Sequence, residues 1–191
     1  MRFVPYHLLA GRPSVIVDGS PAPGTVLTVT HWPGVPPPPG IEADLSAQMA
    51  FRLLDRPDLV PPEAEAVSNN HFDQDGLVSV YALADPHEAR LRQGFLEEVA
   101  LAGDFGVYHD RDAARVSMVL AALARADGLP DDPAELTAAI YEDALGRMPE
   151  LCDHCFVVPS FSIHRIQETH VTLYHMVWDL VHVALGEDDV I

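Results

Sequence analysis

One stretch constrains the fold of this chain more than any other: residues 66–86, AVSNNHFDQDGLVSVYALADP. It begins with a short β-prone run, continues through polar residues as far as Asp75, and becomes apolar from Leu77 to Leu83. A strand, a polar turn and a helix in this order are typical of open α/β sheets, where they place a site at the carboxyl end of a strand. We predict that the helix begins at Gly76 or Leu77 and directs its free N–H groups toward the turn.

The polar turn carries an imidazole and two carboxylates, a set of side chains that suits a divalent cation. His71, Asp73 and Asp75 offer one nitrogen and up to four oxygens, which fits Mn²⁺, Mg²⁺, Fe or Zn rather than Cu(I). In an extended segment, residues i, i+2 and i+4 point the same way, so all three could face one ion or a pair of ions. The alternative is a turn in which Asp75 caps the following helix and Asp73 stabilises the loop.

Residues 71–79, HFDQDGLVS, resemble the first motif of the DHH-family phosphoesterases, HxDxDGxxS. The family includes RecJ-type nucleases, oligoribonucleases and cyclic-dinucleotide phosphodiesterases. The resemblance implies that the motif follows a strand and binds catalytic Mn²⁺, with His71, Asp73 and Asp75 as metal ligands. It also implies that Ser79 matches the small hydroxyl residue on the following helix.

The later part of the chain carries fewer signs of the same family. The resemblance implies a lone aspartate that bridges the metals, and Asp104, which lies between Gly103 and Gly106, is the candidate. The D-H-H triplet of the family is absent, and the nearest residues to it are Asp153 and His154. The glycine-rich G-G-G-H substrate motif is absent as well.

The N-terminal part predicts two strands, residues 14–18 and 25–30, both rich in β-branched side chains. Only residues 19–24 lie between them. A parallel crossover needs a longer connection, so we expect these strands to form an antiparallel hairpin.

An amphipathic helix is predicted for residues 44–54, followed by a strand at residues 66–70. Together with the strand at residues 25–30 they form a parallel βαβ unit. His31 and His71 each follow a strand of this unit, and we therefore expect both to emerge at the same edge of the sheet.

From residue 86 the chain is predicted to be mainly helical. We expect a single α/β domain over residues 1–191, with a small mixed sheet made of the hairpin and the βαβ unit, and a helical portion over roughly residues 86–191 packed on the sheet. The sequence leaves open whether the following polar residues join the site: His109, Asp153, His154, His175, Asp179 and His182.

Charge and composition limit the function. The net charge of −18 at pH 7 argues against binding of long nucleic acids, and every basic residue is an arginine. No apolar run has membrane-spanning length, the N-terminus has no signal-peptide architecture, and two cysteines in a C-x-x-C suit a reducing compartment. We therefore expect a cytoplasmic protein without membrane contacts, whose partner is a small phosphorylated molecule. The sequence does not decide whether it forms a homo-oligomer.

The prediction for function is a metal-dependent hydrolase of a small phosphorylated substrate. Mn²⁺ is the first choice of ion, and Mg²⁺, Fe or Zn are alternatives. Asp75 would act in catalysis, and Asp104 would bridge the ions or complete their coordination shell. Asn70 and His31 would orient the substrate or the ligands. We expect Asp75→Ala to abolish metal binding without unfolding the protein.

Two other functions fit the same residues. One is a non-catalytic binding or regulatory domain that keeps a degenerate DHH-like turn. The other is a small-molecule binding protein without metal, whose cleft is lined by His31, Asn70 and Asp73.

Overall fold

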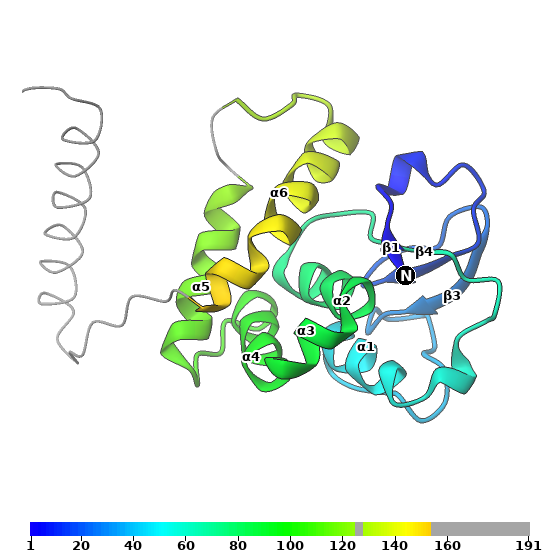
Figure 1. The fold of residues 1–191 in the computed structure, drawn as a ribbon, viewed down its shortest axis with the longest axis horizontal. Helices are drawn as coiled ribbons and strands as arrows, with labels where there is room; N and C mark the ends of the chain where they lie inside the picture. The colour runs from blue at the N-terminus through cyan, green and yellow to red at the C-terminus, as the bar shows by residue number, and fades with distance from the viewer. Residues whose placement is uncertain (125–127, 154–191) are drawn as a thin grey trace, which may run out of the picture. The chain divides into compact units, whose positions relative to one another are not determined.

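A four-stranded parallel sheet organises this computed structural model, which describes residues 1–124 and 128–153. Its strands are β1 (Arg2–Phe3), β2 (Ser14–Val17), β3 (Thr25–Val29) and β4 (Ala66–Ser68), in the order β1-β4-β2-β3. The helices that accompany them are α1 (Ser46–Leu54), α2 (Gln74–Ala84), α3 (Pro86–Leu91), α4 (Gln93–Asp104), α5 (Arg111–Leu123) and α6 (Pro133–Asp153), together with the short 3₁₀ helices η1 (Tyr6–Leu8) and η2 (Pro57–Leu59). The predicted α/β class is confirmed (Figure 1).

The predicted antiparallel hairpin is wrong, because β2 and β3 pair in parallel with Val17 opposite Val29. Since β2 has only four residues, the chain needs to return only about 13 Å before β3 begins. An extended segment covers up to about 3.3 Å per residue, so residues 18–24 can make that return without a helix. Asp18 and Gly24 turn the chain at the two ends of the connection with φ angles of 43° and 89°. The described sheet is therefore parallel throughout rather than mixed.

The two faces of the sheet are covered in different ways. Val15 and Val17 point into the main core, which is completed by apolar side chains of α1, α2, α4, α5 and α6. Ile16, between them in β2, points to the opposite face and packs with Leu9 and Ala66 in a small separate cluster. This alternation is the period of two that a strand imposes on its side chains. The helices thus pack on one face, and the N-terminal segment around η1 covers the other.

Helix α1 confirms the amphipathic pattern predicted for residues 44–54. Met49, Ala50 and Leu53 are buried on one side of the helix, and α1 packs against α2. As predicted, β3, α1 and β4 form a parallel βαβ unit, with β2 inserted between its two strands.

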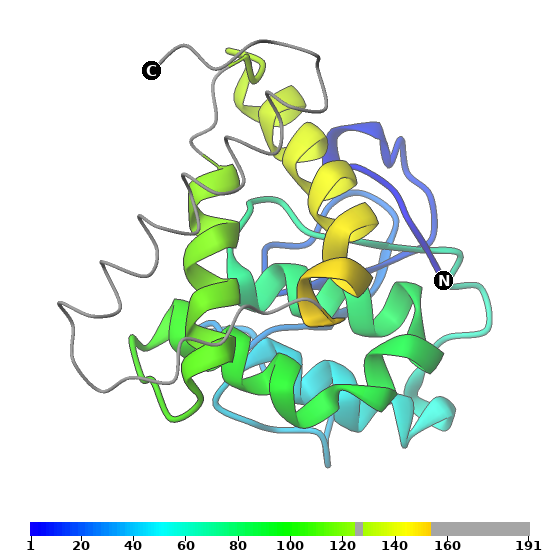
Figure 2. The ribbon, with the colours of Figure 1, turned by 60° about the vertical axis from the view of Figure 1, so that its left-hand side comes forward.

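Other helix boundaries differ from the prediction. Helix α2 begins at Gln74 with Asp73 as its N-cap, so Gly76 lies inside the first turn instead of before it. The helical portion predicted from residue 86 begins with two helices, α3 and α4, which are divided at Arg92, where φ and ψ of −123° and 17° interrupt the helical backbone. Helices α5 and α6 lie side by side in both views (Figures 1 and 2).

In the part of the chain that the structure describes, no helix has the length and apolar character needed to cross a bilayer. The predicted helical portion is described as far as Asp153. The remainder of it, which includes His154, His175, Asp179 and His182, lies outside the described residues.

Candidate metal centre

The carboxyl ends of β2, β3 and β4 lie next to one another in the sheet and each is followed by a polar residue. Asp18 follows β2, His31 follows β3 by two residues, and Asn69 follows β4. Because parallel strands end at the same edge, residues far apart in the sequence meet there. The prediction that His31 and His71 emerge at one edge of the sheet is confirmed.

The first cluster at this edge consists of Asp18, His31 and Asp75. The Nδ1 atom of His31 lies 3.5 Å from Oδ2 of Asp75, and its Nε2 atom lies 4.0 Å from Oδ1 of Asp18. Both carboxylates are buried, with side chains 2% and 0% exposed for Asp18 and Asp75. One ligand atom from each residue could therefore reach a single ion.

The second cluster consists of Asp18, His71 and Asp73. The Nε2 atom of His71 lies 2.8 Å from Oδ2 of Asp73 and 3.4 Å from Oδ2 of Asp18. The ring of Trp32 packs at 5.3 Å between centroids against that of His71, which joins the loop after β3 to the loop after β4. Asp18 thus belongs to both clusters, and each of its oxygens faces a different histidine.

Two polar residues hold Asp18 in this position. Ser46 donates a hydrogen bond of 2.8 Å from Oγ to Oδ1 of Asp18 and accepts one from the His31 backbone N–H. Asn69 donates from Nδ2 to the Asp18 carbonyl and accepts from the His71 backbone N–H at 2.6 Å. These contacts join both clusters through one hydrogen-bonded framework, and such supporting residues orient ligands in metal sites.

Asp75 has a structural role that the sequence did not predict. Its two carboxylate oxygens accept the backbone N–H groups of Ser46 and Ala47, each at 2.8 Å, at the start of α1. The N-cap residue of α1, Leu45, has no side-chain acceptor of its own, so Asp75 supplies the cap from a neighbouring helix. Because Asp75→Ala would leave buried N–H groups without acceptors, we now expect it to destabilise the protein as well as to impair metal binding.

The three predicted ligands of the turn do not face one ion together. Asp73 lies at the N-cap of α2, where its Oδ1 accepts the Gly76 backbone N–H, and Asp75 lies within the first helical turn. The extended geometry assumed for the alternating positions is therefore wrong from Gln74 onward. Asp73 joins His71 in the second cluster, and Asp75 joins His31 in the first.

The carboxylates of the site repel one another in a buried environment. Burial, followed by the charge of Asp18, raises the pKa of Asp75 to about 8. Burial, followed by the charge of Asp73, raises the pKa of Asp18 to about 6. Both shifts follow first from burial and then from the closeness of another carboxylate, and a bound cation would favour the charged forms.

His71 and Asp73 stabilise each other's charged forms. Burial lowers the pKa of His71, but the hydrogen bond to Asp73 and the charges of nearby aspartates outweigh it and raise the pKa overall. Burial works to raise the pKa of Asp73, but the hydrogen bond and charge of His71 prevail and lower it.

Asp104 lies near the site, as predicted, but not between the two clusters. It is the last residue of α4, and its Oδ2 lies 3.5 Å from Nε2 of His31. Burial, with the charge of Asp73, raises its pKa. The position between the clusters is held by Asp18 instead. Asn70 lies beside the second cluster, with Oδ1 at 3.4 Å from Nδ1 of His71.

His109 does not join the site, because its exposed ring faces Glu98, with Nδ1 at 3.4 Å from Oε2. The sequence pattern did not identify Asp18 or Ser46, whereas Asn69 belongs to the polar turn that it did identify. For Asp18 a signal was present: it is the polar residue that ends an apolar run, SVIVD. A hairpin would have placed Asp18 at the opposite edge from His31, so its place in the site depends on the parallel pairing of β2 with β3.

We expect Gly76→Ala to weaken metal binding from a position that carries no ligand. A Cβ atom there would lie 2.4 Å from Nδ2 of Asn69 and 2.8 Å from Oη of Tyr141. The displaced Asn69 would no longer hold Asp18, so metal affinity should fall about 10- to 100-fold and stability by about 1–3 kcal/mol. Calorimetric titration with Mn²⁺ and urea denaturation would measure the two effects.

The matched control is Gly146→Ala in α6, where a Cβ atom meets nothing within 4 Å. An alanine in an exposed helix should raise stability by about 0.5–1 kcal/mol and leave metal affinity unchanged. Unaltered Mn²⁺ affinity in Gly76→Ala would show that Asn69 does not support the ligands.

Comparisons with known proteins place the chain in a family. Over 40 residues it is 45% identical to a phosphoheptose isomerase of Aneurinibacillus thermoaerophilus, a match that covers 21% of this chain and only 20% of that relative. No solved structure matches significantly. Residues 1–179 match the profile of a family described as a family of unknown function, DUF6687. The chain therefore belongs to the DUF6687 family.

Proposed function

We propose that this chain is a divalent-metal-dependent hydrolase of a small phosphorylated substrate, a DHH-like phosphoesterase. The observation that carries the proposal is the position of Asp18, whose two carboxylate oxygens face the histidines of two adjacent clusters. Two-metal hydrolases of phosphoesters hold their ions about 3.5–4 Å apart, and a shared carboxylate is a simple way to fix that spacing.

The residues present fit divalent cations. Carboxylate oxygens and imidazole nitrogens suit Mn²⁺ and also Mg²⁺, Fe or Zn. The buried Nδ1 of His31 has no hydrogen-bond partner among the described residues, so it is available to bind an ion. Asp18, Asp75 and Asp104 all have raised pKa values, so cations would relieve the mutual repulsion of these carboxylates.

Each residue would have a distinct task. Asp18, His31 and Asp75 would hold one ion, and Asp18, His71 and Asp73 a second. When bound, such ions activate a water nucleophile and offset negative charge on the phosphoryl oxygens. Ser46 and Asn69 would keep Asp18 fixed.

Asp104 and Asn70, which belong to neither cluster, would support the reaction. Asp104 is 21% exposed beside Nε2 of His31, where it could accept a proton from the water nucleophile. Asn70 would orient the His71 imidazole through Nδ1 instead of contacting substrate. The side chain of Asp75 is fully buried and capped onto α1, so we assign it to metal binding and not to proton transfer.

The similarity to the phosphoheptose isomerase adds little to this proposal. Its name identifies an enzyme of a phosphorylated sugar, which agrees with a small phosphorylated substrate, but the match covers only 40 residues. The proposal therefore depends on the geometry of the site.

The test combines metal binding and hydrolysis. We expect calorimetric titration of the EDTA-treated protein to give two Mn²⁺ ions per chain, and the Mn²⁺-loaded protein to hydrolyse methyl phosphate or p-nitrophenyl phosphate. His71→Ala should lose one of the two ions and should reduce kcat/KM by more than about 100-fold, because loss of a ligand should cost at least as much as loss of a supporting residue.

His87→Ala is the matched control, since its side chain is 84% exposed outside the clusters. It should bind two ions and keep wild-type activity. Binding of Mn²⁺ without hydrolysis of any phosphoester would favour a non-catalytic binding domain. Absence of Mn²⁺ binding would overturn the proposal.

A further inference from the structure

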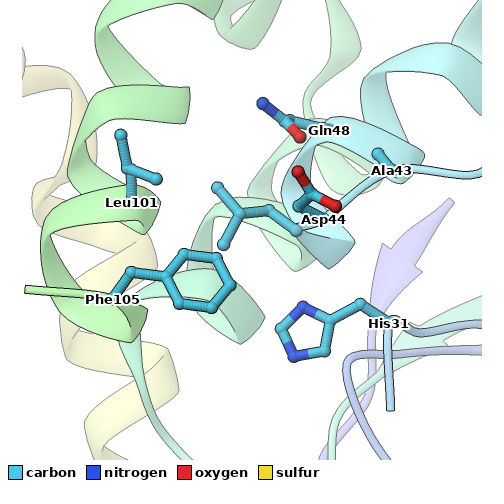
Figure 3. A pocket seen from close by; sticks show the side chains of 7 residues that line it. His31, Ala43, Asp44, Gln48, Leu101 and Phe105 are labelled. Carbon is cyan, nitrogen blue, oxygen red and sulfur yellow. The ribbon is translucent and has the colours of Figure 1, made fainter. Parts of the chain in front are cut away.

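A pocket of about 450 Å³ adjoins the metal centre at His31. It lies between the start of α1 and the end of α4, and this volume falls within the range of small-molecule sites. Figure 3 shows Asp44 and Gln48 on the α1 side, Leu101 and Phe105 on the α4 side, and His31 reaching in from the loop after β3. We propose that this pocket binds the uncharged, hydroxyl-bearing ring of a sugar phosphate, with the phosphate at the metal centre.

The inference rests on the proposed function and names its substrate class. One wall of the pocket is apolar and presents an aromatic face. Phe105 remains 51% exposed, and its ring lies 6.3 Å from the ring of His31 between centroids. Leu101, on the same α4 side, completes this wall. A sugar ring with C–H groups on one face can cover Phe105 and remove this apolar surface from water.

The opposite wall offers hydrogen-bonding groups that have no partner among the described residues. No described residue hydrogen-bonds to or pairs with the Asp44 carboxylate or the Gln48 side-chain amide. Asp44 lies two residues before α1 and Gln48 lies in its first turn, and both side chains line the pocket from this side (Figure 3). A carboxylate accepts hydrogen bonds from hydroxyl groups, and an amide can both donate and accept.

Charge selects against a second anionic group on the substrate. Among the described residues that line the pocket there is no arginine, and the chain contains no lysine. Asp44 therefore faces the bound group as an uncompensated negative charge, which repels a carboxylate or another phosphate. A chain of phosphodiesters passing through this pocket would meet the same repulsion. A neutral ring with several hydroxyl groups satisfies both walls.

The experiment uses two sugar phosphates that differ at one carbon. Glucose 1-phosphate has a hydroxymethyl group where glucuronic acid 1-phosphate has a carboxylate. We expect the Mn²⁺-loaded protein to hydrolyse glucose 1-phosphate with at least tenfold higher kcat/KM. Asp44→Asn should reduce this ratio at least threefold, and Phe105→Leu should raise KM for glucose 1-phosphate at least threefold. For methyl phosphate, which has no ring, kcat/KM of both variants should change less than it does for glucose 1-phosphate.

Saturation-transfer NMR with glucose 1-phosphate and the Mg²⁺-loaded protein supplies a measurement independent of turnover. Signals of the ring protons should be strong with wild type and weakened at least twofold with Phe105→Leu. Asp131→Asn, an exposed aspartate that does not line the pocket, should change neither the NMR signals nor the ratio of kcat/KM values.

The outcomes separate this inference from the proposed function. Failure to hydrolyse methyl phosphate or either sugar phosphate, with ring contacts still present by NMR, would reject the phosphoesterase and retain the pocket. Hydrolysis of methyl phosphate with equal kcat/KM for the two sugar phosphates would reject the pocket assignment. Ring contacts that are unchanged in Phe105→Leu would reject it as well.

Discussion

Asp18→Asn is expected to abolish binding of both metal ions and to lower phosphoesterase kcat/KM by more than about 100-fold. The reason is that Asp18 belongs to both clusters, so one substitution removes a ligand from each. Loss of a residue that only supports a ligand already costs about 10- to 100-fold. Asparagine keeps the size and the acceptor oxygen that Ser46 bonds, so the fold should persist. Calorimetric titration with Mn²⁺ and steady-state kinetics would measure both effects.

Metal-free Asp18→Asn should be at least as stable as metal-free wild type at pH 8, because it removes one of the mutually repelling carboxylates. Asp58→Asn is a matched control, since Asp58 is a surface residue paired with Arg56. It should leave metal binding and activity unchanged. Two-ion binding that survives in Asp18→Asn would contradict a shared ligand at this position.

The metal-free protein is expected to lose stability as pH rises from about 4 to 8. The unfolded chain releases the Asp75 proton near a pKa of 3.8, whereas burial keeps that proton on the folded protein up to a pKa of about 8. Between these values the unfolded state binds fewer protons, so the free energy of unfolding falls. The loss from Asp75 is on the order of 6 kcal/mol, since the two pKa values differ by about four units and each unit corresponds to about 1.4 kcal/mol.

Other groups of the site act in the same direction. The pKa of Asp18 is raised to about 6, and that of His71 is raised as well, so each loses its contribution to stability as pH increases. Asp73 is the exception: its lowered pKa gives stability above about pH 4 that is lost in stronger acid. We therefore expect the metal-free protein to have its highest free energy of unfolding in moderately acidic solution.

Mn²⁺ should weaken this pH dependence. A ligand that binds only the folded state raises its stability by about 2.7 kcal/mol at 100 times its Kd. The gain should be larger at pH 8 than at pH 5, because fewer protons must leave the carboxylates when the ion binds. Urea denaturation at pH 5, 6, 7 and 8, in EDTA and in Mn²⁺, would measure the free energy of unfolding of the metal-free and the metal-bound protein. Metal-free stability that rises between pH 5 and 8 would refute the assignment of a protonated, buried Asp75.

Local sequence determined the elements at the centre of the fold. The amphipathic spacing of residues 44–54 gave α1, and the order of apolar and polar residues after Ala66 placed a strand, a turn and a helix. The same local pattern placed His71, Asp73 and Asp75 at the carboxyl end of a strand, and it placed His31 at the same edge of the sheet. These inferences succeeded because they depend on periodicity and chain direction over short distances.

The tertiary structure decided how the site is completed. Because β2 has only four residues, residues 18–24 are long enough to connect it to β3 in parallel. Whether such a connection is long enough depends on where the strand ends. Parallel pairing brings Asp18 beside His31 and His71, which a hairpin would have prevented. The identity of the shared ligand could therefore not be obtained from local pattern.

The role of Asp75 likewise depends partly on local sequence and partly on tertiary structure. Sequence identified it as a carboxylate at the start of a helix, for which capping of its own helix or metal binding were the available roles. In the structure it caps α1 instead, a contact across 28 and 29 positions of the chain. Sequence by itself determined which residue types reach the edge of the sheet, because strands and helices follow from local periodicity. Only the packing of α1 against α2 and the parallel order of the strands decided which carboxylate meets which histidine, because those distances depend on contacts remote in sequence.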